Sequence, residues 1–292
     1  MSMDLGRATN KGTALLKLAH QFQQEVILRD EYISWFFDEP TISSLQNNPP
    51  DFDSEPRDDY DRILKQSYWY AILREKQGDE LIERAIQAGC RQVLLLGAGY
   101  ETRFFRIQAI KKNAVNTFEV DLSVTIDNKR RCLIKRLGHL PTYLTLIPLD
   151  FNRDNPYDIS AYGFDKAIPS VYIWQGVSYY LPKDSVSRIL DFIGDQMAPG
   201  SVFMFDSCSP LMTFKNDRIQ GIAAQIERLE KIGEPYIFGM YGNEMKAWLY
   251  DKGFQDIQIQ EPGDLEFKYL HRRTLPENMW YVVTIKKANS VR

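Results

Sequence analysis

The chain has 292 residues, 44% of them hydrophobic and 26% charged, and its formal net charge at pH 7 is −3. These values are typical of a globular protein with a full hydrophobic core, and the slight acidity disfavours a nucleic-acid-binding protein, which usually has a basic surface. The sequence contains no run of 18 apolar residues and no apolar leader, so we expect neither a membrane partner nor a signal peptide.

Three cysteines stand far apart in the sequence, at Cys90, Cys132 and Cys208. An odd and scattered set fits neither a disulfide framework nor a zinc site. We therefore predict a cytoplasmic protein without a metal centre.

The first 88 residues differ in pattern from the rest of the chain. Apolar residues at helical spacing predict a helix over residues 13–26, and residues 60–88 predict one long helix that could break near Gly78. Between them, the proline-rich and acidic residues 47–61 indicate an exposed loop or, as the alternative, a docking site for a partner. We expect residues 1–88 to form an N-terminal helical cap or lid.

Short apolar segments alternate with helix-like segments from residue 92 onward. Strands are predicted at residues 93–96, 115–119, 144–148, 171–174, 202–206, 254–261 and 280–285, and helices at 123–137, 184–197 and 215–232. This alternation indicates an α/β fold with a mostly parallel sheet covered on both faces. We expect this α/β domain to span residues 89–292, with a helical insert at about residues 211–240.

The sequence LLLGAGYETRFFR places two glycines directly after the first of these strands. Ligands of open parallel sheets bind beyond the carboxyl ends of the strands, and Gly97 and Gly99 would let the backbone approach a ligand closely. Thr102 stands where a dinucleotide-binding fingerprint has its third glycine, and no GKS or GKT sequence follows. The turn therefore indicates a ligand without a pyrophosphate and disfavours a nicotinamide-dependent dehydrogenase.

Acidic residues follow the next two strands. In FEVDL, Glu119 and Asp121 lie 20 and 22 residues beyond Gly99, about where a carboxylate accepts hydrogen bonds from ribose hydroxyls. We favour Asp121, although it could instead be the N-cap of the following helix. In PLDFN, Asp150 and Phe151 suit an adenine ring, because a carboxylate accepts a hydrogen bond from the exocyclic amine of adenine. Together these residues predict an adenosine site without phosphates.

These motifs resemble those of the class I S-adenosylmethionine-dependent methyltransferases. More narrowly, LLLGAGYETRFFRI, FEVDL, PLDFN and IWQGVSYYL are similar to motifs of the leucine carboxyl methyltransferase family, including its bacterial branch of natural-product O-methyltransferases similar to the tetracenomycin carboxyl methyltransferase. The resemblance spans about residues 74–206. It implies a Rossmann-like fold with a seven-stranded, mostly parallel sheet, and S-adenosyl-L-methionine as the cofactor, with S-adenosyl-L-homocysteine as its product.

The resemblance also implies a role for individual residues. Arg74, in AILREKQGDEL, stands where the family has an arginine that binds the methionine carboxylate, which a guanidinium fork matches well. Lys17 is a weaker candidate for the same group. The other positions expected to contact the cofactor are Gly97, Ala98, Gly99, Asp121, Leu122, Asp150, Phe151, Gln175 and Gly176.

Two positions depart from the family pattern. Glu101 replaces the usual aspartate before Thr102, which is a mild change. Gln175 replaces a frequent glutamate near the amino group of the cofactor, where an amide oxygen still accepts a hydrogen bond but contributes no charge.

The need for a general base depends on the methyl acceptor. A carboxylate is ionised at neutral pH and needs none, whereas a hydroxyl group would need one. His271, in KYLHRRT, is the candidate base at a substrate lip, and Tyr179, beside Tyr180, is the candidate in the substrate pocket; surface exposure and ordinary packing are the respective alternatives.

We expect an O-methyltransferase that acts on a hydroxyl or carboxyl oxygen of a small secondary metabolite, as a monomer or homodimer. Methylation of a protein's C-terminal leucine is the first alternative. The second is a non-catalytic protein that binds the cofactor as a scaffold.

Overall fold

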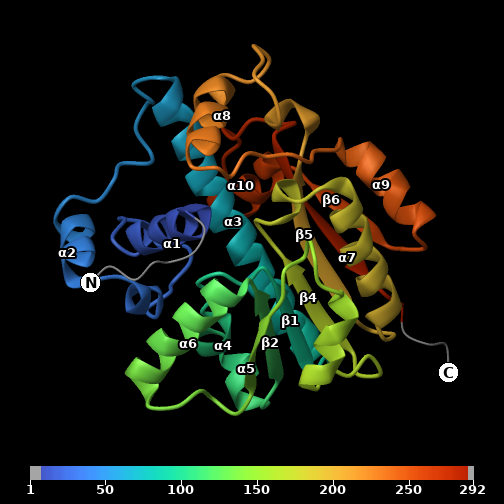
Figure 1. Cartoon of the computed structure of the whole chain (residues 1–292). Helices are drawn as coiled ribbons and strands as arrows, with labels where there is room; N and C mark the ends of the chain where they lie inside the picture. The colour runs from blue at the N-terminus through green and yellow to red at the C-terminus, as the bar shows by residue number, and fades with distance from the viewer. Residues whose placement is uncertain (1–7, 289–292) are drawn as a thin grey trace.

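The computed structural model describes residues 8–288 and is built around a seven-stranded sheet with the order β3-β2-β1-β4-β5-β7-β6 (Figure 1). The first five strands pair in parallel, and β7 runs antiparallel to both β5 and β6. The predicted α/β fold with a mostly parallel sheet is confirmed. The strands are β1 Gln92–Leu96, β2 Asn116–Asp121, β3 Leu144–Pro148, β4 Ser170–Trp174, β5 Val202–Cys208, β6 Ile257–Gln260 and β7 Trp280–Lys286.

Helices cover both faces of this sheet (Figure 1). The α-helices are α1 Ala8–His20, α2 Glu39–Asn47, α3 Asp59–Gln87, α4 Arg103–Arg106, α5 Gln108–Lys112, α6 Ser123–Leu137, α7 Lys183–Gln196, α8 Ile222–Lys231, α9 Gly242–Asp251 and α10 Pro262–Leu270. Short 3-10 helices occur at η1 Ile33–Phe36, η2 Pro156–Tyr162, η3 Ser178–Tyr180 and η4 Pro210–Met212.

Strand β1 lies at the centre of the sheet and is buried on both faces. Val93 and Leu95 pack in a core that includes α3, whereas Leu94 and Leu96 pack in a second core that includes α7 and α9. The chain continues from β1 to β2 and β3 on one side and then returns to β4 on the other. The strand order therefore reverses between β1 and β4, where open α/β sheets bind their ligands.

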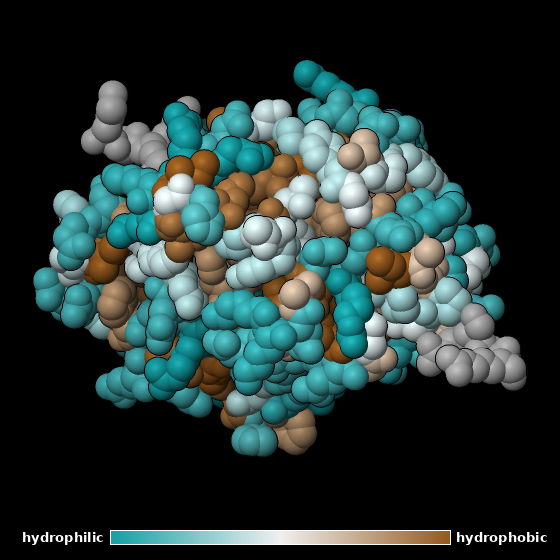
Figure 2. Space-filling model, turned by 90° about the horizontal axis from the view of Figure 1, so that it is seen from below, coloured by the Kyte–Doolittle hydropathy of each residue, from teal (hydrophilic) through white to brown (hydrophobic). Residues whose placement is uncertain are grey.

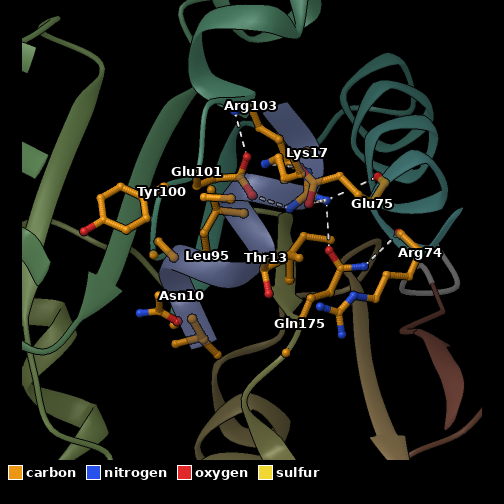
Figure 3. Close-up of a pocket in the computed structure, with 17 residues that line it drawn as sticks. Asn10, Thr13, Lys17, Arg74, Glu75, Leu95, Tyr100, Glu101, Arg103 and Gln175 are labelled. Carbon is orange, nitrogen blue, oxygen red and sulfur yellow. Dashed lines mark hydrogen bonds and ion pairs between the residues drawn. The ribbon is translucent and has the colours of Figure 1, made fainter. Parts of the chain in front are cut away.

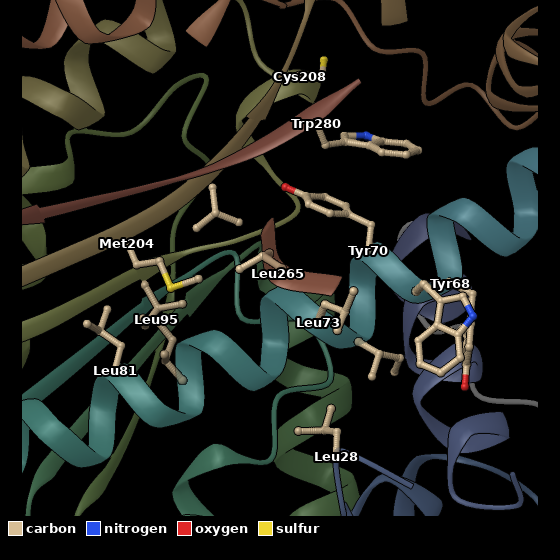
Figure 4. Packing of buried hydrophobic residues seen from close by; sticks show 14 of the residues in the cluster. Leu28, Tyr68, Tyr70, Leu73, Leu81, Leu95, Met204, Cys208, Leu265 and Trp280 are labelled. Atoms are coloured by element: carbon tan, nitrogen blue, oxygen red, sulfur yellow. The ribbon is translucent and has the colours of Figure 1, made fainter. Parts of the chain in front are cut away.

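Helix α3 extends unbroken across one face of the sheet (Figure 4). The side chain of Asp58 caps its first turn by accepting from the amide of Asp61, and the ring of Tyr70 stacks on Trp280 at a centroid distance of 5.2 Å. The predicted break near Gly78 is wrong. This glycine stays helical, and a Cβ there would lie 2.9 Å from a guanidinium nitrogen of Arg103, so its small size serves a close contact and not a kink.

Several predicted boundaries differ from the observed ones for identifiable reasons. Helix α1 ends at His20, six residues before the predicted end, because the buried imidazole accepts from the amides of Ile27 and Leu28 and turns the chain back. The helix predicted over residues 215–232 is shorter in the structure. It corresponds to α8, which begins after Gly221, a residue with φ of +84°. The predicted strand 254–261 is only β6, and α2, α9 and α10 were not predicted.

In the view of Figure 2, hydrophobic residues show as separate patches between hydrophilic ones. Within residues 8–288, no helix is both long and apolar enough to span a bilayer.

Candidate functional site

Three adjoining cavities lie at the carboxyl ends of the central strands. The first, here called the glycine cavity, is bounded by residues 95–101 together with α1 and α3. The second, the strand-tip cavity, is bounded by the ends of β2 and β3, and the third, the aromatic chamber, lies between α1, α3 and α8. Asn10 and Gly176 line all three cavities, so the three spaces meet at these two residues.

The glycine turn after β1 has the tight geometry that its sequence predicts. Gly97 and Gly99 have φ values of +69° and +50°, a conformation that side chains disfavour. A Cβ on Gly97 would lie 2.2 Å from a methyl carbon of Val177, so no larger residue fits. Gly97, Ala98 and Gly99 all line the glycine cavity.

The two acids near the end of β2, Glu119 and Asp121, lie in different surroundings. Asp121 lines the strand-tip cavity, and its carboxylate accepts from the amide of Gly99 at 2.8 Å and from that of Leu122 at 2.7 Å. Glu119 is fully buried, and its carboxylate lies 2.6 Å from the ammonium of Lys129. Burial raises the pKa of Glu119 to about 7 although Lys129 opposes the shift. Of the two acids, only Asp121 faces a cavity.

The end of β3 completes the strand-tip cavity. Asp150, Phe151 and Leu122 line it together with Asp121, which is the grouping expected from the sequence. The amide of Asn152 donates to the carboxylate of Asp150 at 2.9 Å, so the loop after β3 holds that side chain.

Arg74, on α3, lies where the glycine cavity meets the aromatic chamber. Its guanidinium forms a buried ion pair with Asp206 at the end of β5 and donates to the hydroxyl of Tyr179 at 3.0 Å. The other carboxylate oxygen of Asp206 accepts from the amide of Gly176 at 2.7 Å. Arg74 is therefore oriented by a carboxylate that itself fixes the loop after β4.

A buried group of charged side chains reaches one wall of the glycine cavity, where Figure 3 shows four of its members, Lys17, Glu75, Glu101 and Arg103. We call it the ion cluster; it comprises three cations and four carboxylates, and so a net charge of −1 when all are ionised. Its members are Lys17, Asp30, Glu75, Asp79, Glu101, Arg103 and Arg106.

Glu75 stands at the centre of the ion cluster. Its carboxylate lies 2.7 Å from the ammonium of Lys17 and 2.5 Å from a guanidinium nitrogen of Arg106. Burial alone would raise the pKa of Glu75, but Arg103, Lys17 and Arg106 hold that pKa well below its usual range. Burial would likewise lower the pKa of Lys17, but Glu75, Glu101 and Asp30 together outweigh burial and raise that pKa. Glu75 and Lys17 are therefore both ionised at neutral pH.

Gln175 connects the ion cluster to α3. Its amide oxygen accepts from Arg103 at 2.8 Å, and its amide nitrogen donates to the carbonyl of Arg74 at 2.8 Å. A glutamate at this position has no N–H group and could not donate the second bond. The glutamine therefore provides a contact that the usual residue of the family pattern would not.

The aromatic chamber has a volume of about 250 Å³. Its walls include the rings of Tyr70, Tyr179, Tyr180, Tyr236 and Trp280. The helix of the predicted insert, α8, contributes two polar side chains, and α1 forms the opposite wall.

The segment after α8 also holds the first turn of α1. The carboxylate of Glu234 accepts from the amide of Ala8 at 2.7 Å and from that of Thr9 at 3.1 Å. An acidic group at a helix N-terminus satisfies free amides and interacts favourably with the helix dipole. Sequence reasoning missed this contact because its partners are more than 220 residues apart.

The histidine hypothesis is not supported by the structure. His271 is exposed at the end of α10, where its ring faces Phe267, and it lines none of the three cavities. The structure therefore does not bring His271 together with the other predicted site residues: the chain reverses at this residue, with φ of +54°, outside the three cavities. Tyr179, by contrast, lines the aromatic chamber.

The chain is similar in sequence to proteins that are named as methyltransferases. A relative from Mycobacteroides abscessus, named as an S-adenosyl-L-methionine-dependent methyltransferase, is 28% identical over 221 residues, which cover 70% of this chain and 69% of the relative. A relative from Streptomyces avermitilis with the same kind of name is 31% identical over 195 residues, which cover 66% of each chain. The alignments thus span about two thirds of these relatives.

Solved structures share the fold. A DUF574 family protein from Streptomyces avermitilis has a TM-score of 0.59 at 12% identity and covers 94% of this chain and 97% of its own. A Thermobifida fusca protein described as a methyltransferase has a TM-score of 0.53 at 20% identity and covers 82% of this chain and 98% of its own.

The family assignment rests on a match to more than half of the chain. The family model described as leucine carboxyl methyltransferase matches residues 11–194 of the 292, a stretch that includes α3, the glycine turn and the ends of β2, β3 and β4. The chain belongs to the leucine carboxyl methyltransferase family.

Proposed function

We propose that this protein transfers a methyl group from S-adenosyl-L-methionine to an oxygen atom of a small organic acceptor. The observation that carries the proposal is the junction at Asn10 and Gly176, where the two cavities over the strand ends adjoin the aromatic chamber. A cofactor in the first two cavities and an acceptor in the third would meet at that junction. The family and the names of its relatives support the reaction and the cofactor.

The charges around the glycine cavity fit the proposed cofactor. S-adenosyl-L-methionine has a sulfonium, an ammonium and a carboxylate group, and so a net charge of +1, which complements the net −1 of the ion cluster. We assign the methionine carboxylate to Arg74 and the methionine chain to the backbone of residues 97–99. The guanidinium of Arg74 has N–H donors left for this contact, because only one of its nitrogen atoms pairs with Asp206.

We assign the adenosine to the strand-tip cavity. Asp121 would accept from the ribose hydroxyls, since each carboxylate oxygen can accept more bonds than the one backbone amide it now receives. Asp150 and Phe151 would hold the adenine, with Leu122 beside the ring. Gly97 lines both cofactor cavities, and a side chain there would collide with Val177 beside them.

The protein's own contribution to the reaction would be positioning. Methyl transfer is an in-line displacement that needs the acceptor oxygen at near-attack distance and water excluded. Tyr179 is assigned to acceptor positioning: burial raises the pKa of its phenol well above the ordinary value even though Arg74 opposes the shift, so it would donate a hydrogen bond and not act as a base.

We also propose a two-part organisation, with residues 1–88 as a cap and residues 89–292 as the methyltransferase domain. Helix α1 supports the proposal because it lines all three cavities from outside the sheet. The insert containing α8 would complete the acceptor side.

The second candidate acceptor is the C-terminal leucine of a protein, which the description of the family favours. The test is incubation with S-adenosyl-L-methionine and separate panels of small carboxylic acids, phenols and peptides ending in leucine, with S-adenosyl-L-homocysteine as the readout. We expect turnover with a small molecule. Turnover with the peptides alone would select the second candidate, and cofactor binding without any turnover would select the scaffold.

A further inference from the structure

Among the residues that the structure describes, no aspartate, glutamate, histidine, lysine or cysteine lines the aromatic chamber. Its ionisable groups are two arginines and four tyrosines. Asp206 lies beneath the chamber and is fully buried, with its oxygens engaged by Arg74 and by the amide of Gly176. The chamber therefore offers no carboxylate or imidazole to an acceptor.

The tyrosines cannot replace the missing base. Burial raises the pKa of Tyr70, Tyr179 and Tyr180 well above the ordinary value, and it also raises the pKa of Tyr236. All four are neutral phenols near pH 7. An acceptor oxygen that enters this chamber must therefore be ionised before it arrives, as a carboxylate is at neutral pH.

The two arginines of the chamber differ in how their charge is balanced. Arg74 is paired with Asp206, whereas Arg228, half-buried on α8, takes part in none of the ion pairs found among residues 8–288. Within the described part of the chain, the only polar contact found for its guanidinium is to the side-chain oxygen of Gln225, one turn earlier, at 3.3 Å. Arg228 therefore brings an unbalanced positive charge to a chamber whose other side chains, apart from the paired Arg74, are neutral.

We propose that Arg228 is a specificity-determining residue that binds the negative charge of the acceptor, and that the acceptor is an aromatic carboxylic acid. This inference rests on the proposed function. The rings of the chamber match an aromatic body, and a guanidinium matches a carboxylate in geometry and charge. In the transfer, a carboxylate oxygen forms the new bond to the methyl carbon as the carbon–sulfur bond breaks. The electron pair stays on sulfur, and no proton is released.

The test compares two probes that differ only in charge, 2-naphthoate and 2-naphthamide. Their binding to the full chain is measured by calorimetry after saturation with S-adenosyl-L-homocysteine. We expect the acid to bind at least about tenfold more tightly than the amide, because a charge-assisted hydrogen bond is worth roughly twice a neutral one. Equal binding, or no binding of the acid, would overturn the inference.

Three variants separate recognition from folding. Arg228→Gln should weaken binding of the acid by about tenfold or more and leave that of the amide unchanged, and Arg228→Lys should retain part of the preference. Lys231→Gln removes a charge from the exposed end of the same helix, outside the chamber, and should change neither. An equal loss for both probes in Arg228→Gln, or the same loss in Lys231→Gln, would contradict the assignment.

The saturation step keeps this inference distinct from the proposed function. Binding of S-adenosyl-L-homocysteine without a preference for the acid would refute the role of Arg228 and leave the methyltransferase proposal in place. Failure of S-adenosyl-L-homocysteine to bind would remove both. With an acid that turns over, a weakly buffered indicator assay should show no proton release, whereas methylation of a hydroxyl would release one proton per turnover.

Discussion

The sharpest test of the proposed cofactor site is the removal of the carboxylate at the end of β2. In Asp121→Ala, the assigned ribose hydroxyls lose both of their acceptor oxygens, and the amides of Gly99 and Leu122 lose theirs. The variant should therefore affect both cofactor binding and the stability of the turn. These two effects can be measured separately.

The expected size of the binding effect follows from the number of bonds lost. A hydrogen bond to a charged group contributes about 1.5–3 kcal/mol, so two such bonds to the ribose give at least ~3 kcal/mol. That free energy corresponds to about a hundredfold rise in the Kd for S-adenosyl-L-homocysteine. The two backbone amides that lose a partner should lower the free energy of unfolding by about 1–3 kcal/mol.

Calorimetric titration of Asp121→Ala with S-adenosyl-L-homocysteine measures the first effect, and urea unfolding measures the second. Asp127→Ala is the matched control, because it removes an exposed carboxylate from the adjacent helix α6 without changing the cavity. We expect unchanged binding in the control. A Kd for Asp121→Ala within about threefold of the original protein, a free-energy change below 1 kcal/mol, would refute the ribose assignment.

Three further predictions concern the structure around the site. Gly97→Ala should lower the Tm and abolish cofactor binding, because its Cβ would overlap Val177 at a positive φ; an unchanged Tm in thermal melts would contradict this. Burial lowers the pKa of His20 to about 4 from 6.5, so the unfolded chain binds a proton that the folded chain does not, and unfolding free energy should fall by about 3 kcal/mol between pH 6.5 and 4. Urea titrations of His20→Gln should show a shallower pH dependence than those of the original protein. Lys17→Met should cost about 3–5 kcal/mol by leaving buried carboxylates without a partner, while the exposed Lys11→Met on the same helix should cost little in the same assay.

The sequence predicts those parts of the fold whose signals are local. The helix over residues 123–137 was predicted with the bounds of α6, because its helical spacing is a short-range feature. The strands were predicted because buried parallel strands are short apolar runs. The glycine turn and the acids after β2 and β3 could be grouped for a similar reason, since the ends of parallel strands meet at one edge of a sheet.

The ion cluster could not be predicted, because its charges come from distant parts of the chain. Arg103 and Arg106 were visible in the motif, but nothing local indicates that Glu75 and Asp30 would face them. His271 shows the converse: its position beside two arginines is a local feature, and it did not indicate that the fold places this residue outside the three cavities. The sequence shows which residues are charged, but only tertiary packing determines which of them come into contact.

Helix α1, whose first turn contacts Glu234, lines both the cavities over the strand ends and the aromatic chamber. The carboxylate of Glu234 holds the first turn of the helix, and the same helix supplies Asn10 to all three cavities. Under the proposed function, a displacement of this 13-residue helix would change the walls of the cofactor cavities and of the acceptor chamber together.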